Sequence, residues 1–507
     1  MEAATTTGQR NHGGGRLAFD AWLETALRNP ILWSVLVAGI WLLQLSLIFT
    51  HEPWQDEWQA LQIALQSPDF AALLDNLRYE GHPPLWYLLL IGVSIILPAD
   101  WVLPAVQAAI ATMLQALILI YSPFPRRQKL LLATSFFVLF DYSVLSRSLS
   151  LGALILTAFF AFRHYRASWL LIALLPLTDF LFGLLSIISV AIQWRARRLW
   201  WPGLLFWFVT GVAAILTVWP APDVIPALHL LSPSAEVSAL ITRLSALLIP
   251  LHMANGHLQW NNPPPYPLSV VAGPLFLLFC WVQVRGRHFD AALLFGFATA
   301  AALFSIFVYP LAIRHLSLIA WLLILLRWHT MQEGLAPRRW FEPWLVALSI
   351  CGLVTAGLNL TRPFDTDEQV ARYIVSHGLR DAHWLVFPDS AAQGVSALIG
   401  MEFDRLEMDC SESFIRWNYA TTIKSQQRFE EVLHAATKKY GRLYLLVNDP
   451  LPGLDDSRYV RGLAQFPPGY DGQAYRLYEL GLDRPRTGLR APSCPPRRVP
   501  LTVMARD

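Results

Sequence analysis

Long apolar segments alternate with short loops that carry the charged residues over the first 360 or so positions of the chain. An apolar run of about 18 residues or more is typical of a helix that crosses a membrane. The pattern therefore predicts a mainly α-helical, polytopic transmembrane bundle of about 11–13 spans over residues 31–360. The expected crossings are Ile31–Thr50, Pro104–Tyr121, Leu130–Asp141, Ser148–Phe162, Trp169–Leu177, Leu181–Trp194, Leu199–Trp219, Leu268–Val284, Ala291–Tyr309, Leu316–Leu326 and Pro343–Leu360.

One apolar stretch, Pro84–Leu97, is only about half as long as a membrane span. We interpret it as a re-entrant or juxtamembrane helix, and a full crossing stays open as the alternative. The expected outer loops cover residues 51–103 and 220–267, the second with a surface helix at Val237–Leu251. Residues 1–30 are expected to form a cytoplasmic segment with a short surface helix at Leu17–Leu27.

From Thr361 onward the composition changes to that of a water-soluble domain. The pattern predicts helices at Val370–His377 and Phe429–Tyr440 and strands at Trp384–Phe387 and Arg442–Val447. Strands that alternate with helices favour a small α/β domain over residues 361–482. The remaining residues, 483–507, are rich in Pro and Arg and are predicted to be disordered.

Composition and charge support this division and add a topology. The chain is 55% hydrophobic and only 15% charged, whereas soluble domains carry about 25% charged residues. Basic residues cluster in short loops, for example Arg195, Arg197 and Arg198, and such loops face the cytoplasm. This places the N-terminus inside and the C-terminal domain outside, as expected in a bacterial inner membrane with a periplasmic domain; the lumen of a eukaryotic reticulum is topologically equivalent. The net charge of +3 is too small and too scattered to predict a nucleic-acid partner.

The four cysteines leave one question open. Cys280 and Cys351 fall in expected spans, where cysteine is usually a small apolar residue. Cys410 and Cys494 fall in the outer part, where an oxidising compartment would permit a disulfide, but the spacing does not decide whether they pair. The sequence has neither a CxxC nor an HExxH spacing, and we predict no metal site.

Candidate chemistry concentrates in the stretch His51–Tyr87, directly after the first expected span. Its acid pair, Asp56 and Glu57, is flanked by Trp54 and Trp58. Partial burial beside the membrane would raise the pKa of Asp56 toward the range of a general base. The alternative is that both acids only begin a surface helix, where negative charge favours the positive end of the helix dipole.

The order of an apolar span, Asp-Glu and, some two dozen residues later, His-Pro-Pro-Leu-Trp-Tyr resembles the GT-C superfamily of glycosyltransferases that use polyprenyl-phosphate sugars. This group includes protein O-mannosyltransferases and the aminoarabinose transferase that modifies lipid A. Residues 142–151, residues 178–183 and the Arg314-His315-Leu316 run are similar to later segments of the family. The resemblance implies a GT-C-like catalytic bundle with an outer C-terminal domain.

By this resemblance Asp56 would be the catalytic base, with Glu57 orienting it or the acceptor. The donor would be a sugar on undecaprenyl phosphate and the acceptor a lipid, protein or glycan, with no cofactor besides the lipid-linked sugar. The residues implied in binding donor phosphate or substrate are Glu80, His82, Arg147, Asp179, Arg314 and His315. Boundary arginines are often functional, although each could also reach toward lipid headgroups, and Asp179 could simply cap a helix.

The sequence departs from the family in two places. Leu149 stands where some relatives have an acid or a tyrosine, and neither outer loop contains Asp-x-Asp. We therefore expect metal-independent transfer with inversion at the anomeric carbon. Two other classes stay open: a transporter or flippase of envelope lipids or glycans, which would show repeated halves, and a non-catalytic envelope scaffold. Convergence of Asp56, Arg147 and Arg314 at one place would favour the enzyme.

Overall fold

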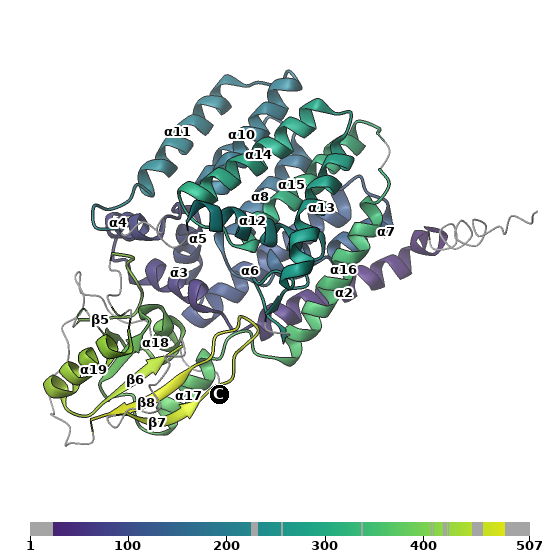
Figure 1. Ribbon diagram of the computed structural model, residues 1–507. Coiled ribbons are helices and arrows are strands. Elements are labelled where there is room, and N and C mark those ends of the chain that lie inside the picture. Colours follow the sequence, from purple (N-terminus) through teal and green to yellow (C-terminus); the bar gives the residue numbers. More distant parts are fainter. Residues whose placement is uncertain are drawn as a thin grey trace, which may run out of the picture.

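The computed structural model describes residues 24–224, 232–254, 257–335, 338–406, 408, 410–418, 423, 425–448 and 460–481. The protein is mainly helical, with a helix bundle and a small mixed α/β domain that lies below α3 in Figure 1. The predicted disordered tail, Cys494 and most of the N-terminal segment lie outside the described residues.

Five helices of the described chain are long and apolar enough to cross a membrane. They are α2 (Pro30–Thr50), α6 (Ala99–Ala116, continued by the π-helical η1 to Tyr121), α13 (Tyr266–Val284), α14 (His288–Phe307) and α16 (Phe341–Thr361). Asn29 begins α2 by accepting hydrogen bonds from the first backbone N–H groups, which have no partner inside the helix. A multi-helix membrane bundle fits this composition, whereas the number of crossings stays a prediction.

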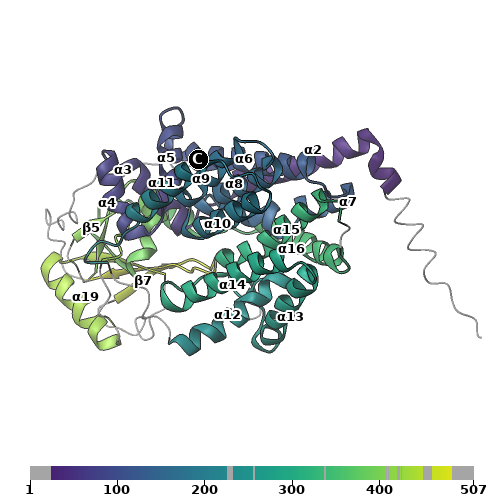
Figure 2. The same cartoon turned by 90° about the horizontal axis from the view of Figure 1, so that it is seen from above.

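Shorter apolar helices complete the bundle around one buried helix. They are α5 (Leu85–Ser94), α8 (Ser148–Phe162), α9 (Ser168–Leu174, extended by η3 to Leu177), α10 (Phe180–Arg195) and α11 (Trp201–Thr217). The buried helix is α15 (Ile313–Gln332), which contacts α8, α12 and α14. Figure 2 shows α12, α13 and α14 along one side of the bundle. The expected span Leu316–Leu326 covers only the middle of α15. It ended too early because the helix continues through polar residues such as Arg327, which are buried in the protein.

The expected crossing Leu130–Asp141 is wrong as a continuous helix. The chain forms α7 (Arg126–Ala133), turns at Thr134 and Ser135, and continues as the π-helical η2 (Phe136–Asp141). Gly352 of α16 lies against this turn so closely that an added Cβ would meet the Thr134 carbonyl oxygen at 2.2 Å. The break and the glycine thus let α16 approach the backbone directly.

The expected surface helix at Val237–Leu251 is α12 (Pro233–Leu248), and it belongs to the bundle. It contacts α13, α14 and α15, and a Cβ on Gly273 of α13 would lie 2.1 Å from the Ile241 carbonyl oxygen. Its Glu236 is buried, and its Oε1 accepts hydrogen bonds from Arg243 and Ser305. The sequence pattern is amphipathic, so it did not distinguish a membrane surface from a protein surface.

The first outer loop forms two short helices, α3 (Gln55–Gln66) and α4 (Phe70–Glu80). Asp69 begins α4 by accepting a hydrogen bond from the Ala72 N–H at 2.8 Å. Gly81 ends α4 with φ +72°, a left-handed conformation that glycine adopts without strain. The chain then turns at once into α5, whose ten residues rise about 15 Å, half of a membrane.

The C-terminal domain is a three-layer α/β unit around a six-stranded sheet of order β5-β4-β3-β6-β8-β7. The central β3 (Trp384–Phe387) runs parallel to β4 (Phe403–Arg405) and β6 (Leu443–Val447). The other three strands pair antiparallel with their neighbours; they are β5 (Cys410–Glu412), β7 (Val460–Gln465) and β8 (Arg476–Leu480). Trp384 and Val386 face α17 (Asp367–Ser376) and α18 (Gln393–Ile399), whereas Leu385 and Phe387 face α19 (Gln426–Tyr440). This alternation confirms the predicted buried strand and its two flanking helices.

Glutamines of α3 join the C-terminal domain to the bundle. The Gln59 amide donates to the Ile415 carbonyl at 2.7 Å and accepts from the Ile415 N–H at 3.0 Å. Gln62 donates to the Gln393 carbonyl at 2.6 Å, and Gln66 accepts from the Ser413 hydroxyl at 2.7 Å. Gln59 and Gln62 are buried. Because buried amides are stable only when hydrogen-bonded, these contacts stabilise the packing of the domain against α3.

Candidate functional site

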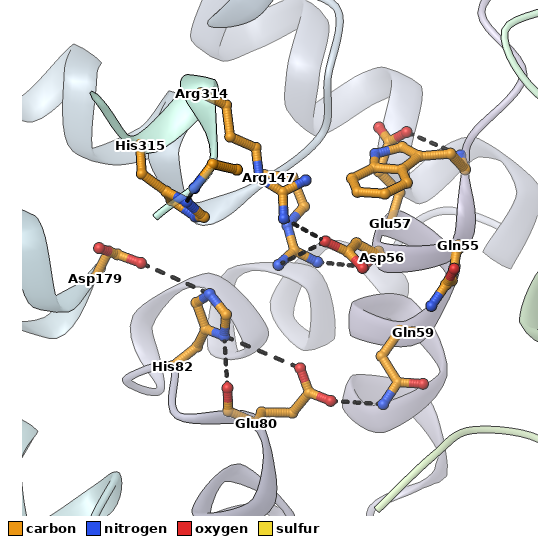
Figure 3. Close-up of polar contacts among 12 residues, drawn as sticks. Gln55, Asp56, Glu57, Gln59, Glu80, His82, Arg147, Asp179, Arg314 and His315 are labelled. Atoms are coloured by element: carbon orange, nitrogen blue, oxygen red, sulfur yellow. Dashed lines mark hydrogen bonds and ion pairs between the residues drawn. The ribbon is translucent and has the colours of Figure 1, made fainter. Parts of the chain in front are cut away.

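Asp56 and two arginines from distant parts of the chain meet at one place (Figure 3). Asp56 lies in the first turn of α3, Arg147 directly precedes α8, and Arg314 lies in the first turn of α15. The Arg314 Nη2 donates to Asp56 Oδ2 at 2.7 Å, and the Arg147 Nη2 lies 3.7 Å from the same oxygen. Arg147 also donates to the Asp56 main-chain carbonyl. The structure thus brings together the three residues whose convergence the enzyme hypothesis predicts.

Aromatic rings hold the Arg314 guanidinium in place. The Trp54 ring centroid lies 4.8 Å from the Arg314 Cζ, and the Trp260 ring lies 5.6 Å from it. A guanidinium over an indole face is attracted by the negative face of the ring. The Arg314 Nη1 is buried and, among the described residues, has no hydrogen-bond partner. A buried N–H group without a partner is unfavourable, and this one could donate only to an anion that entered the site.

Glu57 does not face this cluster but fastens its backbone. Its side chain is fully buried, and its Oε2 accepts from the Trp54 N–H at 3.0 Å and lies 2.8 Å from His51 Nε2. Its Oε1 accepts from the Ser146 N–H at 2.5 Å. Glu57 therefore ties the start of α3 to the segment that carries Arg147. We assign it a positioning role in place of direct contact with the acceptor.

Glu80, His82 and Asp179 form a second polar group beside the first. The His82 Nε2 lies 3.7 Å from Asp179 Oδ2, and its Nδ1 lies 3.0 Å from the Glu80 carbonyl oxygen and 4.0 Å from Glu80 Oε2. The Gln59 amide donates to Glu80 Oε1 at 2.6 Å. Asp179 also begins α10 by accepting from the Leu181 N–H at 2.9 Å. Asp179 thus combines the two roles considered for it, helix capping and contact with the site.

His315 lies next to Arg314 in sequence but serves its own helix. Its Nδ1 accepts a hydrogen bond from the Ala312 N–H at 3.1 Å, and the side chain is buried against Tyr309. Figure 3 shows the imidazole beside the cluster without a contact to Asp56 or Arg147. Its position supports the start of α15, on which Arg314 depends.

Two carboxylates of the site, Asp56 and Glu80, have opposite electrostatic environments. Burial opposes ionisation of Asp56, but the guanidinium groups of Arg147 and Arg314 outweigh it and lower the pKa of Asp56. The expected raised pKa of Asp56 is therefore wrong. Burial raises the pKa of Glu80 to about 7, although hydrogen bonds from Gln59 and Trp417 act in the opposite direction. Neighbouring acids with divergent pKa values are typical of acid–base sites.

No family model, curated protein or solved structure matches the chain. The family resemblance therefore supplies a proposal, and the geometry of the side chains supplies its support. Among the described residues, no group of three or more His, Cys, Asp or Glu side chains could hold a metal ion.

Sequence reasoning missed three contributors to the site. Gln59 binds Glu80, Trp54 stacks on Arg314, and Trp417 of the C-terminal domain hydrogen-bonds Glu80. Gln59 lies one turn after Asp56 on the same helix, and this spacing was the only feature of the sequence that could have placed Gln59 in the site. The sequence indicates Trp54 only as a neighbour of the two acids, and nothing near Trp417 points to a residue more than 300 positions earlier.

Proposed function

We propose that this protein is a membrane glycosyltransferase that moves a sugar from a polyprenyl-phosphate donor to an acceptor at the outer face of the membrane. The observation that carries this proposal is the convergence of Asp56, Arg147 and Arg314, with one Arg314 donor left without a partner. A non-catalytic scaffold has no need of this convergence, whereas the transporter alternative is distinguished by the transfer assay below.

The arginines are suited to the phosphate of the donor. Guanidinium groups bind phosphate through two parallel N–H donors, and each is charged at every physiological pH. The side chains of Arg147 and Arg314 are 9% and 14% exposed, so their charges are only partly screened by water. Fixed positive charge stabilises a phosphate that becomes more negative as the sugar leaves.

Asp56 is suited to accept a proton from the acceptor hydroxyl. Its side chain keeps 24% of its surface exposed, which is enough for contact with a ligand. Arg147 and Arg314 lower the pKa of Asp56. A donor phosphate that engaged these arginines would weaken that effect and so would shift the pKa of Asp56 upward. Donor binding thus makes Asp56 a better base at the moment when the acceptor reacts.

In the transfer step the acceptor O–H proton moves to Asp56 while the acceptor oxygen bonds to the anomeric carbon. The bond from that carbon to the phosphate oxygen breaks, and its electron pair leaves with the lipid phosphate, held by Arg147 and Arg314. Attack opposite to the leaving group inverts the anomeric carbon. We assign Glu80 and His82 to acceptor binding, with Glu80 accepting hydrogen bonds when ionised.

The C-terminal domain is proposed to face the periplasm. Cys410 is disulfide-bonded, whereas Cys280 and Cys351 in the bundle are free thiols. Disulfides persist in oxidising compartments and are rare in the cytosol. This supports an outer position for the domain and, through the glutamines of α3, for Asp56 as well.

The test is transfer of labelled sugar from polyprenyl-phosphate donors to a membrane extract by the purified protein. Asp56→Asn is expected to lower the rate about 10²–10⁴-fold, the usual contribution of a general base, with donor binding retained. Asp69→Asn is the matched control, because it makes the same change in the same loop at a helix cap that asparagine satisfies equally well. Unchanged transfer by Asp56→Asn would remove Asp56 from the mechanism. A wild-type protein inactive with every donor would favour the transporter or scaffold.

A further inference from the structure

A second polar site lies on the other side of the loop that leads into α3. A cavity of about 160 Å³ is lined by the end of α2, the start of α6 and the first turn of α17. His51, Trp58 and Ser146 form the wall toward Asp56 and Arg147, and neither of these two residues lines the cavity. The cavity therefore lies next to the proposed transfer site and is separate from it.

Four carboxylates line this cavity, and Arg372, which is not among its lining residues, pairs with only one of them, Glu368. The carboxylates belong to Glu52, Asp100, Asp367 and Glu368, and none of the lining residues is lysine or arginine. Asp367 is only 3% exposed, and its Oδ1 has no hydrogen-bond partner among the described residues; the same holds for the buried Glu52 Oε2. Buried carboxylate oxygens without donors are unfavourable. Two buried carboxyl oxygens at this cavity thus have no donor in the described part of the chain, and a ligand with N–H groups would supply one.

The position of the cavity indicates how deep in the membrane this ligand would lie. Phe49 and Leu103 contribute its apolar wall, and they belong to the ends of α2 and α6, two of the candidate spans. Beside it Phe49 and Trp101 are in ring contact at 6.0 Å and are 37% and 46% exposed. Exposed aromatic rings at the ends of spans are typical of the headgroup level of a bilayer.

We propose that this cavity binds the primary ammonium group of a membrane-resident amphiphile. An ammonium carries three N–H donors and one positive charge, which matches several carboxylates with free oxygens. A divalent metal fits less well, because the described residues contain no group of side chains arranged to hold one. The proposal does not rest on the transfer reaction. The ammonium could come from a phospholipid headgroup or from an amino sugar on a lipid.

The charges around Glu52 set a pH dependence for this binding. Burial, together with Glu368 and Asp365, raises the pKa of Glu52 to about 7, and His51 and Arg372 oppose this effect. Asp367 faces the same group, and burial and Asp365 raise its pKa as well. A protonated carboxyl cannot pair with ammonium. The affinity is therefore expected to increase as the pH rises through about 7.

The experiment uses the full chain in nanodiscs made of equal parts of dioleoylphosphatidylethanolamine and dioleoylphosphatidylcholine. Native mass spectrometry measures which lipid the released protein retains. The wild type is expected to prefer the ethanolamine lipid, and Glu52→Gln and Asp367→Asn are expected to reduce that preference about tenfold or more. Asp69→Asn, outside the cavity, is expected to behave as the wild type. Glu52→Gln removes one of several mutually repelling carboxylates, so its unfolding midpoint in SDS is expected to be unchanged or higher.

A second arm separates the two sources of the amine. An octyl glycoside with a 2-amino group is compared with octyl glucoside as a competitor for the same site. Retention of the ethanolamine lipid that depends on Glu52 assigns the site to a phospholipid headgroup. Binding of only the amino glycoside, again dependent on Glu52, assigns it to an amino sugar. Equal retention of both phospholipids together with equal binding of both glycosides would overturn the proposal, whatever the outcome of the transfer assay.

Discussion

Glu57 offers the sharpest test of how the transfer site is built. In the structure its fully buried carboxylate accepts hydrogen bonds from the Trp54 and Ser146 N–H groups at 3.0 and 2.5 Å, with His51 Nε2 at 2.8 Å. The change Glu57→Gln keeps the size of the side chain but leaves only one accepting oxygen. Its NH₂ group must then face a backbone N–H of Trp54 or of Ser146, donor against donor.

The magnitude follows from these bonds. A hydrogen bond to a charged group contributes about 1.5–3 kcal/mol, and the variant loses at least one such bond and the charge that strengthens the others. We expect the free energy of unfolding to fall by about 2–4 kcal/mol. Because the lost bond also fixes the segment of Arg147, donor affinity should fall more than the rate at saturating donor.

The assay is SDS-induced unfolding in mixed micelles, followed by donor titration of the transfer rate. Glu430→Gln on the exposed surface of α19 makes the same chemical change and is expected to leave both quantities unaltered. A neutral surface change alters the free energy of unfolding by about 0.5 kcal/mol or less. If Glu57→Gln changed the free energy of unfolding by no more than this and yet abolished transfer at saturating donor, the positioning role would be refuted. Glu57 would then have to act in the chemistry itself.

Two further predictions concern the acceptor group and the packing of the bundle. Because the pKa of Glu80 is raised to about 7, the ionised form that binds acceptor is lost below that pH, and the wild-type transfer rate should fall as the pH drops from 8 to 6. In a pH–rate profile Glu80→Gln should lack this inflection, and an inflection that persisted would assign it to another group. Gly352→Ala would bring a Cβ within 2.2 Å of the Thr134 carbonyl oxygen and should lower the free energy of unfolding by about 1–3 kcal/mol. Gly357→Ala on the same helix meets nothing within 4 Å and should raise it by about 0.5–1 kcal/mol; equal effects of the two changes in SDS unfolding would contradict the packing described.

The helices and strands that could be predicted best from the sequence are those with a clear pattern of apolar residues. The long apolar helices α2, α13, α14 and α16 were predicted to within a few residues, because no charged residue interrupts the apolar segments of these helices. The buried strand β3 was predicted at its observed residues. By contrast, α12 and the turn between α7 and η2 depend on close approaches by Gly273 and Gly352, and no local pattern encodes the partner of a glycine.

The sequence was sufficient to predict which residues form the candidate site, but not how their charges interact. Asp56, Arg147 and Arg314 could be named from their places at the ends of apolar segments. Their ion pairs could not, and these reverse the expected pKa shift of Asp56. Likewise the acidity of Glu80 depends on burial and on a residue of the C-terminal domain, Trp417, which is distant in sequence.

The glutamines of α3 also determine which changes the C-terminal domain can tolerate. Gln59 and Gln62 contact main-chain atoms of Ile415 and Gln393. Most substitutions of Ile415 or Gln393 therefore leave these contacts in place. An insertion or deletion near either position would shift the carbonyl groups out of register with α3. Since Gln59 also binds Glu80, the same shift would alter the acceptor group. Related chains could therefore vary freely in the side chains of this seam while keeping the length of its segments, and a chimera should exchange the domain together with α3.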